Sequence, residues 1–229
     1  MNTFTYHHVA KHLIAVDCII FGFDGDVLKG LFIKRKLAPE KGNWSLMGGF
    51  VAETESVDAA AERILYELTG LTNVYMEQLN CYGKIDRDPV ARVISIAYYA
   101  LINIADYSAD MLTQHDATWI SLNELPPLIF DHQQMVQDAK DRLKQKVANH
   151  PVGFALLPTK FTLRQLQALY EAIYEVPLDK RNFTRKIFSI NILKKLEEKE
   201  RTSSRKGSYY FVFDEEKYKQ LEKEGLKFI

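Results

Sequence analysis

Residues 49–71 read GFVAETESVDAAAERILYELTGL, and this stretch is the most informative part of the first half of the chain. Its apolar residues recur with the period of an amphipathic helix, at Val57, Ala60, Ala61, Ile64, Leu65 and Leu68. Ser56 is a typical N-cap residue, and Gly70 is typical of the position just beyond a helix end. The spacing therefore predicts one helix with two defined ends.

The same stretch resembles the Nudix box, a loop and helix of the form G-x5-E-x7-R-E-U-x-E-E-x-G-U, where U is an aliphatic residue. The positions that match are Gly49, Glu55, Arg63, Leu65, Glu67, Gly70 and Leu71. Glutamates three and four residues apart share one face of a helix, so their carboxylates can hold Mg²⁺ for a nucleoside diphosphate.

Two positions of the box that require glutamate hold Ile64 and Leu68 instead. Aliphatic carbon cannot ligate a hard cation, so we assign no catalytic residue and no metal ligand. The sequence favours a Nudix-like fold whose catalysis is lost or weakened. A working hydrolase and a plain core-packing helix are the alternatives. No cofactor is required, and Mg²⁺ is expected only if the hydrolase alternative holds.

The rest of the first half predicts strands and one further helix. Residues 13–23 and 27–34 are strand-like runs joined by Asp24-Gly25-Asp26, which predicts a β-hairpin. More strands are expected at residues 73–82, 92–104 and 118–121, and a polar helix at about 132–147. This order predicts a mixed α+β fold in which a sheet and helices form a sandwich.

The second half predicts a different kind of unit. Thr162 and Gln165 form a capping box ahead of a helix, and Pro177 ends that helix. Asp179 then caps a second helix, in which Phe183, Ile187 and Ile190 form the buried stripe. A β-hairpin over residues 192–214 and a closing polar helix over 214–224 follow. This order is typical of a winged helix-turn-helix.

The second helix presents polar and basic side chains that suit DNA. Arginine can reach guanine edges, asparagine an adenine, and lysine the phosphates. The residues expected to contact DNA are Lys180, Arg181, Asn182, Thr184, Arg185 and Lys186 on the helix, and Arg201, Arg205 and Lys206 at the tip of the hairpin. The alternative is a winged helix that binds another protein and never meets DNA.

Charge divides the chain at the same place. Residues 1–150 carry 14 Lys+Arg against 19 Asp+Glu, a net charge of −5, whereas residues 151–229 carry 16 against 11, a net charge of +5. We therefore expect two domains, residues 1–150 and 151–229. The hydrophobic fraction of 47% excludes wholly disordered and low-complexity classes.

Compartment and membrane association follow from the cysteines and the hydropathy. Cys18 and Cys81 show no metal-ligand spacing and are too few to staple a small secreted fold. The first residues lack the pattern of a signal peptide, and the longest apolar stretch is too interrupted for a membrane span. We expect a cytoplasmic protein without a membrane partner.

Together the two halves resemble the Nudix-related transcriptional regulators, which join a Nudix-like sensor to a winged helix-turn-helix. The run from Leu178 to Ile187, LDKRNFTRKI, is the most specific part of this resemblance. The resemblance implies a homodimer that binds a double-stranded DNA operator, responds to a small-molecule effector and acts as a repressor. Effectors in this group include ADP-ribose and sugars such as L-arabinose.

The effector is expected to bind in the first half. Asp86, Arg87, Asp88 and Pro89, followed by Arg92, are similar to a segment of Nudix proteins that handle ADP-ribose. The candidate effector-binding residues are Glu55, Arg63, Glu67, Arg87 and Arg92. Because two box carboxylates are missing, there is less reason to hold a metal-bound diphosphate, and this favours a sugar. Active hydrolysis of ADP-ribose is the competing function.

Overall fold

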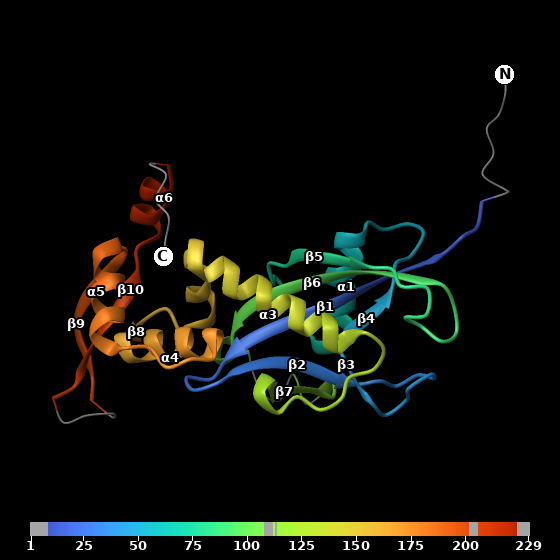
Figure 1. The fold of residues 1–229 in the computed structure, drawn as a ribbon, viewed down its shortest axis with the longest axis horizontal. Helices are drawn as coiled ribbons and strands as arrows, with labels where there is room; N and C mark the ends of the chain where they lie inside the picture. The colour runs from blue at the N-terminus through green and yellow to red at the C-terminus, as the bar shows by residue number, and fades with distance from the viewer. Residues whose placement is uncertain (1–8, 108–111, 113, 202–205, 224–229) are drawn as a thin grey trace, which may run out of the picture.

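The computed structural model describes residues 9–107, 112, 114–201 and 206–223. Figure 1 shows a large sheet with helices α1 and α3 at one end of an elongated molecule. A smaller unit containing α4, α5 and three short strands lies at the other end. The α+β arrangement follows the pattern in the sequence.

The first unit contains a seven-stranded mixed sheet. Its elements are β1 (Leu13–Phe23), β2 (Leu28–Lys34), β3 (Trp44–Ser45), β4 (Met47–Phe50), α1 (Val57–Thr69), β5 (Glu77–Tyr82), β6 (Val93–Asn103), β7 (Ala117–Ser121) and α3 (His132–Asn149). The main path of the sheet is β3-β2-β1-β6-β5, with β4 paired to β1 and β7 paired to β2. The predicted hairpin of β1 and β2 is confirmed, with Ile20 opposite Leu31.

Strand β1 is the centre of this unit because both of its faces are covered. Side chains alternate along a strand, so Val16, Cys18 and Ile20 point to the α1 side. Ile19, Phe21 and Phe23 point to the α3 side. Asp17 shares the parity of this second set, which places a carboxylate on the buried face beneath α3.

Helix α1 begins and ends where the sequence predicts. The Ser56 hydroxyl accepts a hydrogen bond from the Ala59 N–H at 3.1 Å, and Gly70 has a left-handed φ of 74°. At the end of β4, a Cβ on Gly49 would lie 2.7 Å from Ile64 Cδ1, so a larger residue there would displace the Ile64 side chain. The aliphatic residue that replaces a box glutamate therefore packs directly under the box glycine.

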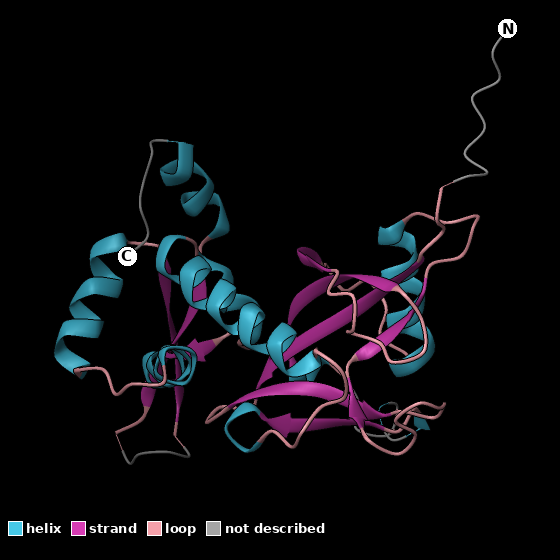
Figure 2. Cartoon of the chain, turned by 45° about the vertical axis from the view of Figure 1, so that its right-hand side comes forward, coloured by secondary structure: helices cyan, strands magenta, loops and turns pink. Residues whose placement is uncertain are grey.

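The second unit has the order of a winged helix domain. A 3-10 helix, η3 (Pro151–Leu156), leads into β8 (Phe161–Thr162), α4 (Leu163–Tyr174), α5 (Lys180–Ile190), β9 (Leu193–Glu200), β10 (Ser208–Phe213) and α6 (Glu215–Lys223). The sheet order is β8-β10-β9. In Figure 2 this unit lies to the left, with cyan helices beside its magenta strands, and the large sheet lies to the right. The capping box of Thr162 and Gln165 and the Asp179 cap are both present.

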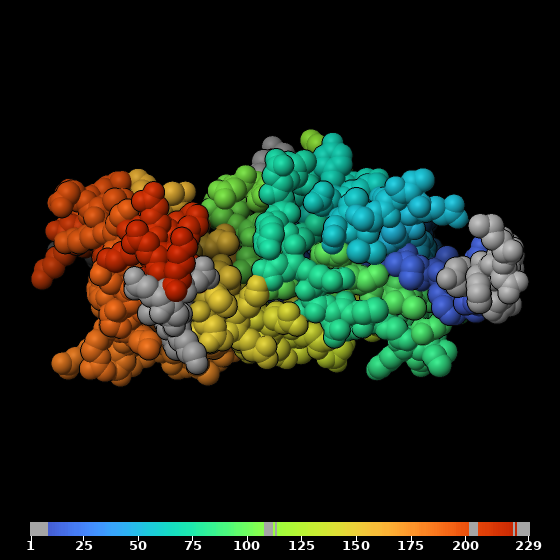
Figure 3. Space-filling view, turned by 90° about the horizontal axis from the view of Figure 1, so that it is seen from above, coloured from blue at the N-terminus to red at the C-terminus, as the bar shows by residue number. Residues whose placement is uncertain are grey.

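The two units share one hydrophobic core. Buried residues on the α3 side of the large sheet continue without a break into the winged helix, through Val147, Leu156 and Leu169 among others. Helix α3, yellow in Figure 3, lies against both the large unit and the orange winged helix unit. A displacement of α3 would therefore change the packing of both units.

Some expectations from the sequence need correction. The strand expected at residues 73–82 begins only at Glu77. Phe183 is half-buried rather than fully buried, since it lies at the edge of the α5 stripe. Strands β3, β4 and β8 were missed because two to four residues are too few to show a period of two. No helix within the described parts of the chain is long and apolar enough to cross a membrane.

Candidate functional site

A buried cluster of charged side chains lies where α3 begins. Asp17 is 4% exposed, and its Oδ2 accepts a hydrogen bond from Ser95 Oγ at 2.6 Å. Arg87 Nη2 lies 3.5 Å from the same oxygen. Arg87 also donates to both oxygens of Asp131, from Nη2 at 2.7 Å and from Nε at 3.0 Å. This cluster ties β1, the loop before β6 and the N-terminus of α3 together.

His132 completes this cluster as a neutral ring. The side chain is 4% exposed, and Nδ1 accepts the Leu46 N–H at 3.2 Å, which leaves the proton on Nε2 facing Asp17 Oδ1 at 3.5 Å. Burial lowers the pKa of the His132 imidazole, outweighing the opposite effect of Asp17 and Asp131. His132 is the first residue of α3, as expected, but its side chain packs inward.

We predict that His132 makes the fold sensitive to acid. The pKa of His132 is lowered in the folded state, so below the ordinary value of 6.5 the unfolded chain binds a proton at this ring more readily than the folded chain does. The free energy of unfolding therefore falls as the pH drops below that value. Urea unfolding at about pH 7.5 and about pH 5 should show a smaller acid-induced loss in His132→Asn, whose oxygen can accept the Leu46 N–H but does not titrate. An equal loss in both proteins would contradict the prediction.

A pocket opens above this cluster at one end of the sheet. Its walls combine glycine backbone, an aromatic ring and charged groups, which suits a small polar ligand. The lining residues are Ala15, Asp17, Arg35, Ser45, Gly48, Gly49, Phe50, Arg87, Asp88, Val93, Phe130 and His132. Gly48 has to be glycine here, because a Cβ would lie 2.1 Å from Asp17 Oδ1. Residues at the start of the Nudix box and residues of the buried cluster thus line one pocket.

The retained box residues form a compact set behind this pocket. Arg63 donates to Glu55 from Nη2 at 2.6 Å and from Nε at 2.9 Å, and to Glu67 from Nη1 at 3.2 Å. Its Nη2 also donates to the Phe50 carbonyl at 3.1 Å. Hydrogen bonds from Arg63 hold the pKa of the Glu55 carboxyl down at about 2. These residues hold the end of β4, where Phe50 joins the pocket wall.

The donor set does not fit the Mg²⁺ that the Nudix box implies. Both Glu55 oxygens already accept hydrogen bonds, from Arg63 and from the Ala52 N–H. Ile64 is 3% exposed in the core, and Leu68 packs against the same core. Across the described residues, no group of three or more His, Cys, Asp or Glu side chains is placed to hold a metal ion. We therefore derive no metal-dependent step.

The five candidate effector residues do not gather at one point. Arg87 lines the pocket, and Arg63 meets the pocket wall through the Phe50 carbonyl. Arg92 lies apart and donates to the Lys84 carbonyl at 2.8 Å. Asp17 and His132 were missed as pocket residues, because each looked like an ordinary strand or helix-start residue in the sequence.

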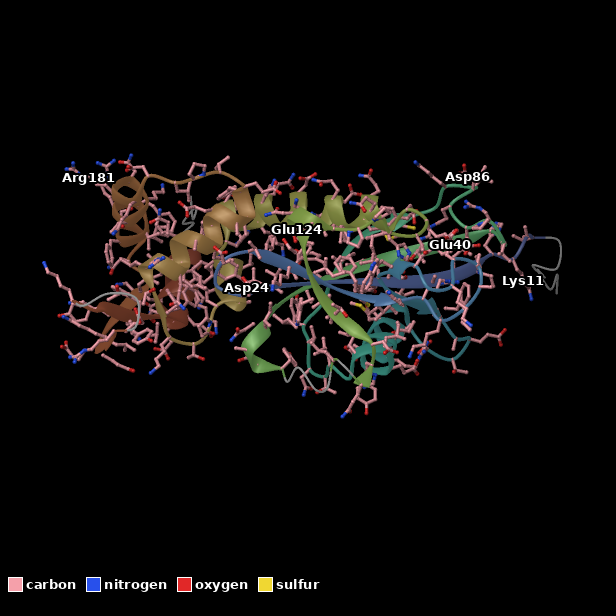
Figure 4. All side chains as sticks on the ribbon, turned by 90° about the horizontal axis from the view of Figure 1, so that it is seen from below. Lys11, Asp24, Glu40, Asp86, Glu124 and Arg181 are labelled. Carbon is pink, nitrogen blue, oxygen red and sulfur yellow. The ribbon has the colours of Figure 1, made fainter. Side chains whose placement is uncertain are left out.

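A second candidate surface is formed by α5. Lys180, Arg181, Asn182, Arg185 and Lys186 are exposed, whereas Thr184 is half-buried. Arg185 Nη2 donates to Asn182 Oδ1 at 3.0 Å, which orients both side chains. Figure 4 shows Arg181 at the extreme end of the molecule, far from Glu40 and Asp86 near the pocket. The α5 surface is therefore well separated from the pocket.

The hairpin of β9 and β10 adds further positive charge beside α5. Arg201 and Lys206 are exposed at its tip, and Arg205 lies outside the described residues. The sequence did not single out Lys195 and Lys199, whose ammonium groups lie 3.6 and 4.3 Å from the centre of the Tyr209 ring. Lys195 and Lys199 are four residues apart, which places them on the same face of a strand, and this spacing is the signal that could have indicated them.

Helix α3 connects the pocket to the DNA-facing unit. It begins at the buried cluster, with Asp131 as its N-cap residue. Further along, Lys140 and Lys144 each lie 2.6 Å from a carboxylate oxygen of Glu175, which ends α4 in a left-handed conformation. Glu175 precedes α5 by only a short turn, so α3 runs from the pocket to the segment that leads into α5.

Two family models match the chain, one in each half. Residues 11–139 match the Nudix domain, and residues 153–213 match the NrtR DNA-binding winged helix domain. An ADPR responsive transcriptional repressor, NtrR of Acinetobacter baylyi, is 32% identical over 202 residues, which cover 86% of this chain and 81% of that protein.

Two further similarities concern DNA and hydrolysis. A crystal structure of Shewanella oneidensis NrtR complexed with a 27mer DNA has a TM-score of 0.78 and 29% identity, and the match covers 90% of this chain and 95% of that one. An ADP-ribose pyrophosphatase of Methanocaldococcus jannaschii is 40% identical over 114 residues, which cover 48% of this chain and 64% of that protein.

Proposed function

Because this chain belongs to the Nudix-related transcriptional regulators that carry an NrtR DNA-binding winged helix domain, we propose that it is a repressor whose operator binding responds to ADP-ribose. Part of the effector would bind in the pocket above Asp17, Arg87 and His132. The operator would bind at α5 and the β9–β10 hairpin. We infer a cytoplasmic homodimer, as expected for a factor that reads a palindromic operator.

The path of α3 is the observation that carries this proposal. Its first residues belong to the buried cluster under the pocket, and its later residues hold Glu175 just before α5. The hydrophobic core is continuous between the two units. A ligand that moves Arg87 would therefore shift α3 through Asp131, and with it the orientation of the recognition helix.

The relatives favour ADP-ribose over a sugar as the effector. The Acinetobacter repressor is named as ADPR responsive, and this chain covers most of its length. The loss of two box carboxylates, which first pointed to a sugar, weakens the case for catalysis but does not prevent binding. Within the pocket, Arg87 and Arg35 offer positive charge. We propose that Glu55, Arg63 and Glu67 hold the end of β4 at Phe50 in place. Arg92 would hold the loop at Lys84 in place.

A regulatory effect requires that the effector binds one arrangement of the dimer better than the other. ADP-ribose would favour the arrangement in which the two α5 helices no longer match successive major grooves. A ligand with equal affinity for both arrangements would leave the operator bound. Coupling of this kind is ordinarily worth about 1–3 kcal/mol, or about 5–150-fold in affinity.

We predict that ADP-ribose releases the operator and that L-arabinose does not. Duplexes selected by the protein from a random library at near-physiological salt would be labelled and followed by fluorescence anisotropy. Saturating ADP-ribose should weaken binding by about 5–150-fold. Release by L-arabinose alone would identify a sugar effector. If neither compound releases the operator, the proposal that the effector is ADP-ribose or a sugar such as L-arabinose is wrong.

The similarity to an ADP-ribose pyrophosphatase and the retained Glu67 favour one second candidate function, slow hydrolysis. It predicts Mg²⁺-dependent release of AMP from ADP-ribose, abolished in Glu67→Gln. We expect no such release, because the box lacks the carboxylates that hold the metal. The matched control is Glu62→Gln on the same helix, which should leave any true hydrolysis unchanged. Release that survives Glu67→Gln would point to a contaminant.

A further inference from the structure

A basic groove lies beside the effector pocket, where β2, β3 and β7 meet. It is lined by Lys34, Arg35, Lys36, Lys41, Trp44 and Asp116, among others. Antiparallel pairing brings these residues together, since Lys34 is opposite Trp44 and Ile33 is opposite Ala117. The groove involves none of the residues assigned above to hydrolysis or to DNA binding.

Positive charge is concentrated in this groove against the trend of its domain. Residues 1–150 contain 14 Lys+Arg and have a net charge of −5, yet four of those 14 side chains line this one hollow. Lys36 lies 3.0 Å from the Asp116 carboxylate, which offsets one of the four charges. Among the described residues that line the groove, Asp116 is the only carboxylate, so the groove keeps a net positive charge.

The loop that carries these cations is held in place by its own hydrogen bonds. Arg35 Nε donates to the Pro39 carbonyl at 2.7 Å and to the Leu37 carbonyl at 3.1 Å. The Arg35 N–H donates to the Asn43 carbonyl at 2.9 Å, and the Gly42 N–H to the Arg35 carbonyl at 2.8 Å. The groove is therefore shaped before a ligand arrives, which reduces the entropy cost of binding.

The groove combines a ring with cations, and it continues into the pocket. The Lys34 ammonium lies 5.2 Å from the centre of the half-buried Trp44 ring. Arg35 lines both the groove and the pocket above the buried cluster, and its guanidinium lies 5.3 Å from the centre of the Phe130 ring. A ligand that carries phosphate together with a ring would satisfy both features.

We propose that this groove binds the phosphate-bearing part of a nucleoside phosphate. Binding in the groove does not depend on the proposed function, but any effect of this binding on the operator does. A ligand held in the groove could extend over Arg35 into the effector pocket. DNA is the less favoured anion. Figure 4 places Glu40, on the loop beside the groove, far from Arg181, on the recognition helix at one end of the molecule.

Tryptophan fluorescence tests the groove without any operator. The chain has two tryptophans, so Trp119→Phe leaves Trp44 as the sole reporter. AMP and ADP-ribose should change its emission saturably, and L-arabinose should not. Lys34→Gln combined with Lys41→Gln should weaken this response by about tenfold or more, since a charge-assisted hydrogen bond to phosphate is worth about that much. Titration calorimetry on the chain with both tryptophans gives a second measurement if Trp119→Phe folds poorly.

The matched control removes the same charge elsewhere. Lys29→Gln on the far end of β2, combined with Lys219→Gln on α6, should leave the Trp44 response unchanged. Three results would overturn the groove: no response to either phosphorylated probe, an equal response in the Lys34 and Lys41 variant, or a response to duplex DNA alone. A Trp44 response without operator release by ADP-ribose would contradict the proposed function but would still support ligand binding in the groove.

Discussion

Replacing Arg87 with methionine is expected to cost about 3–5 kcal/mol of unfolding free energy. The Arg87 side chain is 3% exposed and balances Asp17 and Asp131, whose side chains are 6% and 18% exposed. Methionine fills most of the space but leaves two carboxylates in a poorly solvated site without their cation. Urea unfolding followed by circular dichroism near pH 7 measures the loss.

The control is the same substitution at Arg92, the other arginine of this segment. Arg92 is half-buried and donates to a backbone carbonyl, so Arg92→Met should cost less than about 1 kcal/mol. Adding Asp131→Asn to Arg87→Met should restore part of the stability, because it removes one of the stranded charges. Equal small losses at Arg87 and Arg92 would show that the buried cluster contributes little to the fold.

Features encoded by neighbouring residues could be predicted from the sequence. Ser56 and Gly70 bound α1, and Asp179 caps α5 with its Oδ1 accepting the Asn182 N–H at 2.8 Å. Each device acts over a few residues and leaves a local pattern. The exposed face of α5 was predicted for the same reason, since helical spacing from Ile187 and Ile190 fixes which side chains face outward.

Features that join distant residues could not be predicted in this way. The parallel pairing of β1 with β6 and the bond between Ser95 and Asp17, 78 positions apart, depend on the whole topology. Asp17 sits in a strand of apolar residues, where a single carboxylate gives no local sign of its partner. The basic groove was also missed, because Asp116 and Trp44 meet Lys34 only through the pairing of three strands.

Arg87 illustrates the limit of a motif-based site prediction. The segment around it was assigned to effector binding, and the structure gives the same side chain two carboxylate partners. A residue that balances buried charge can still line a pocket. A ligand phosphate near Arg87 would compete with Asp131 for the guanidinium, and Asp131 is the N-cap residue of α3. Effector binding and helix position would then be coupled through one side chain.

Replacing both Arg181 and Arg185 with alanine is expected to weaken operator binding on the order of 100-fold or more. Each arginine bidentate to a base edge is worth about 1–3 kcal/mol of discrimination, and both side chains are exposed on α5. The change should fall on the selected operator and much less on random duplex, so the ratio of the two affinities should collapse. Anisotropy titrations of both duplexes at one salt concentration measure this ratio.

The lysines of the same helix provide the control. Lys180→Ala combined with Lys186→Ala removes the same charge, but ammonium groups that meet phosphates carry no sequence information. This variant should weaken binding to operator and random duplex alike, and should lower the dependence of affinity on salt by about one unit of slope for each phosphate that is no longer neutralised. All four side chains are exposed, so neither variant should change the unfolding free energy by more than about 0.5 kcal/mol. If the arginine variant instead weakened both duplexes equally, α5 would contact only the backbone, and the operator would have to be read by the β9–β10 hairpin.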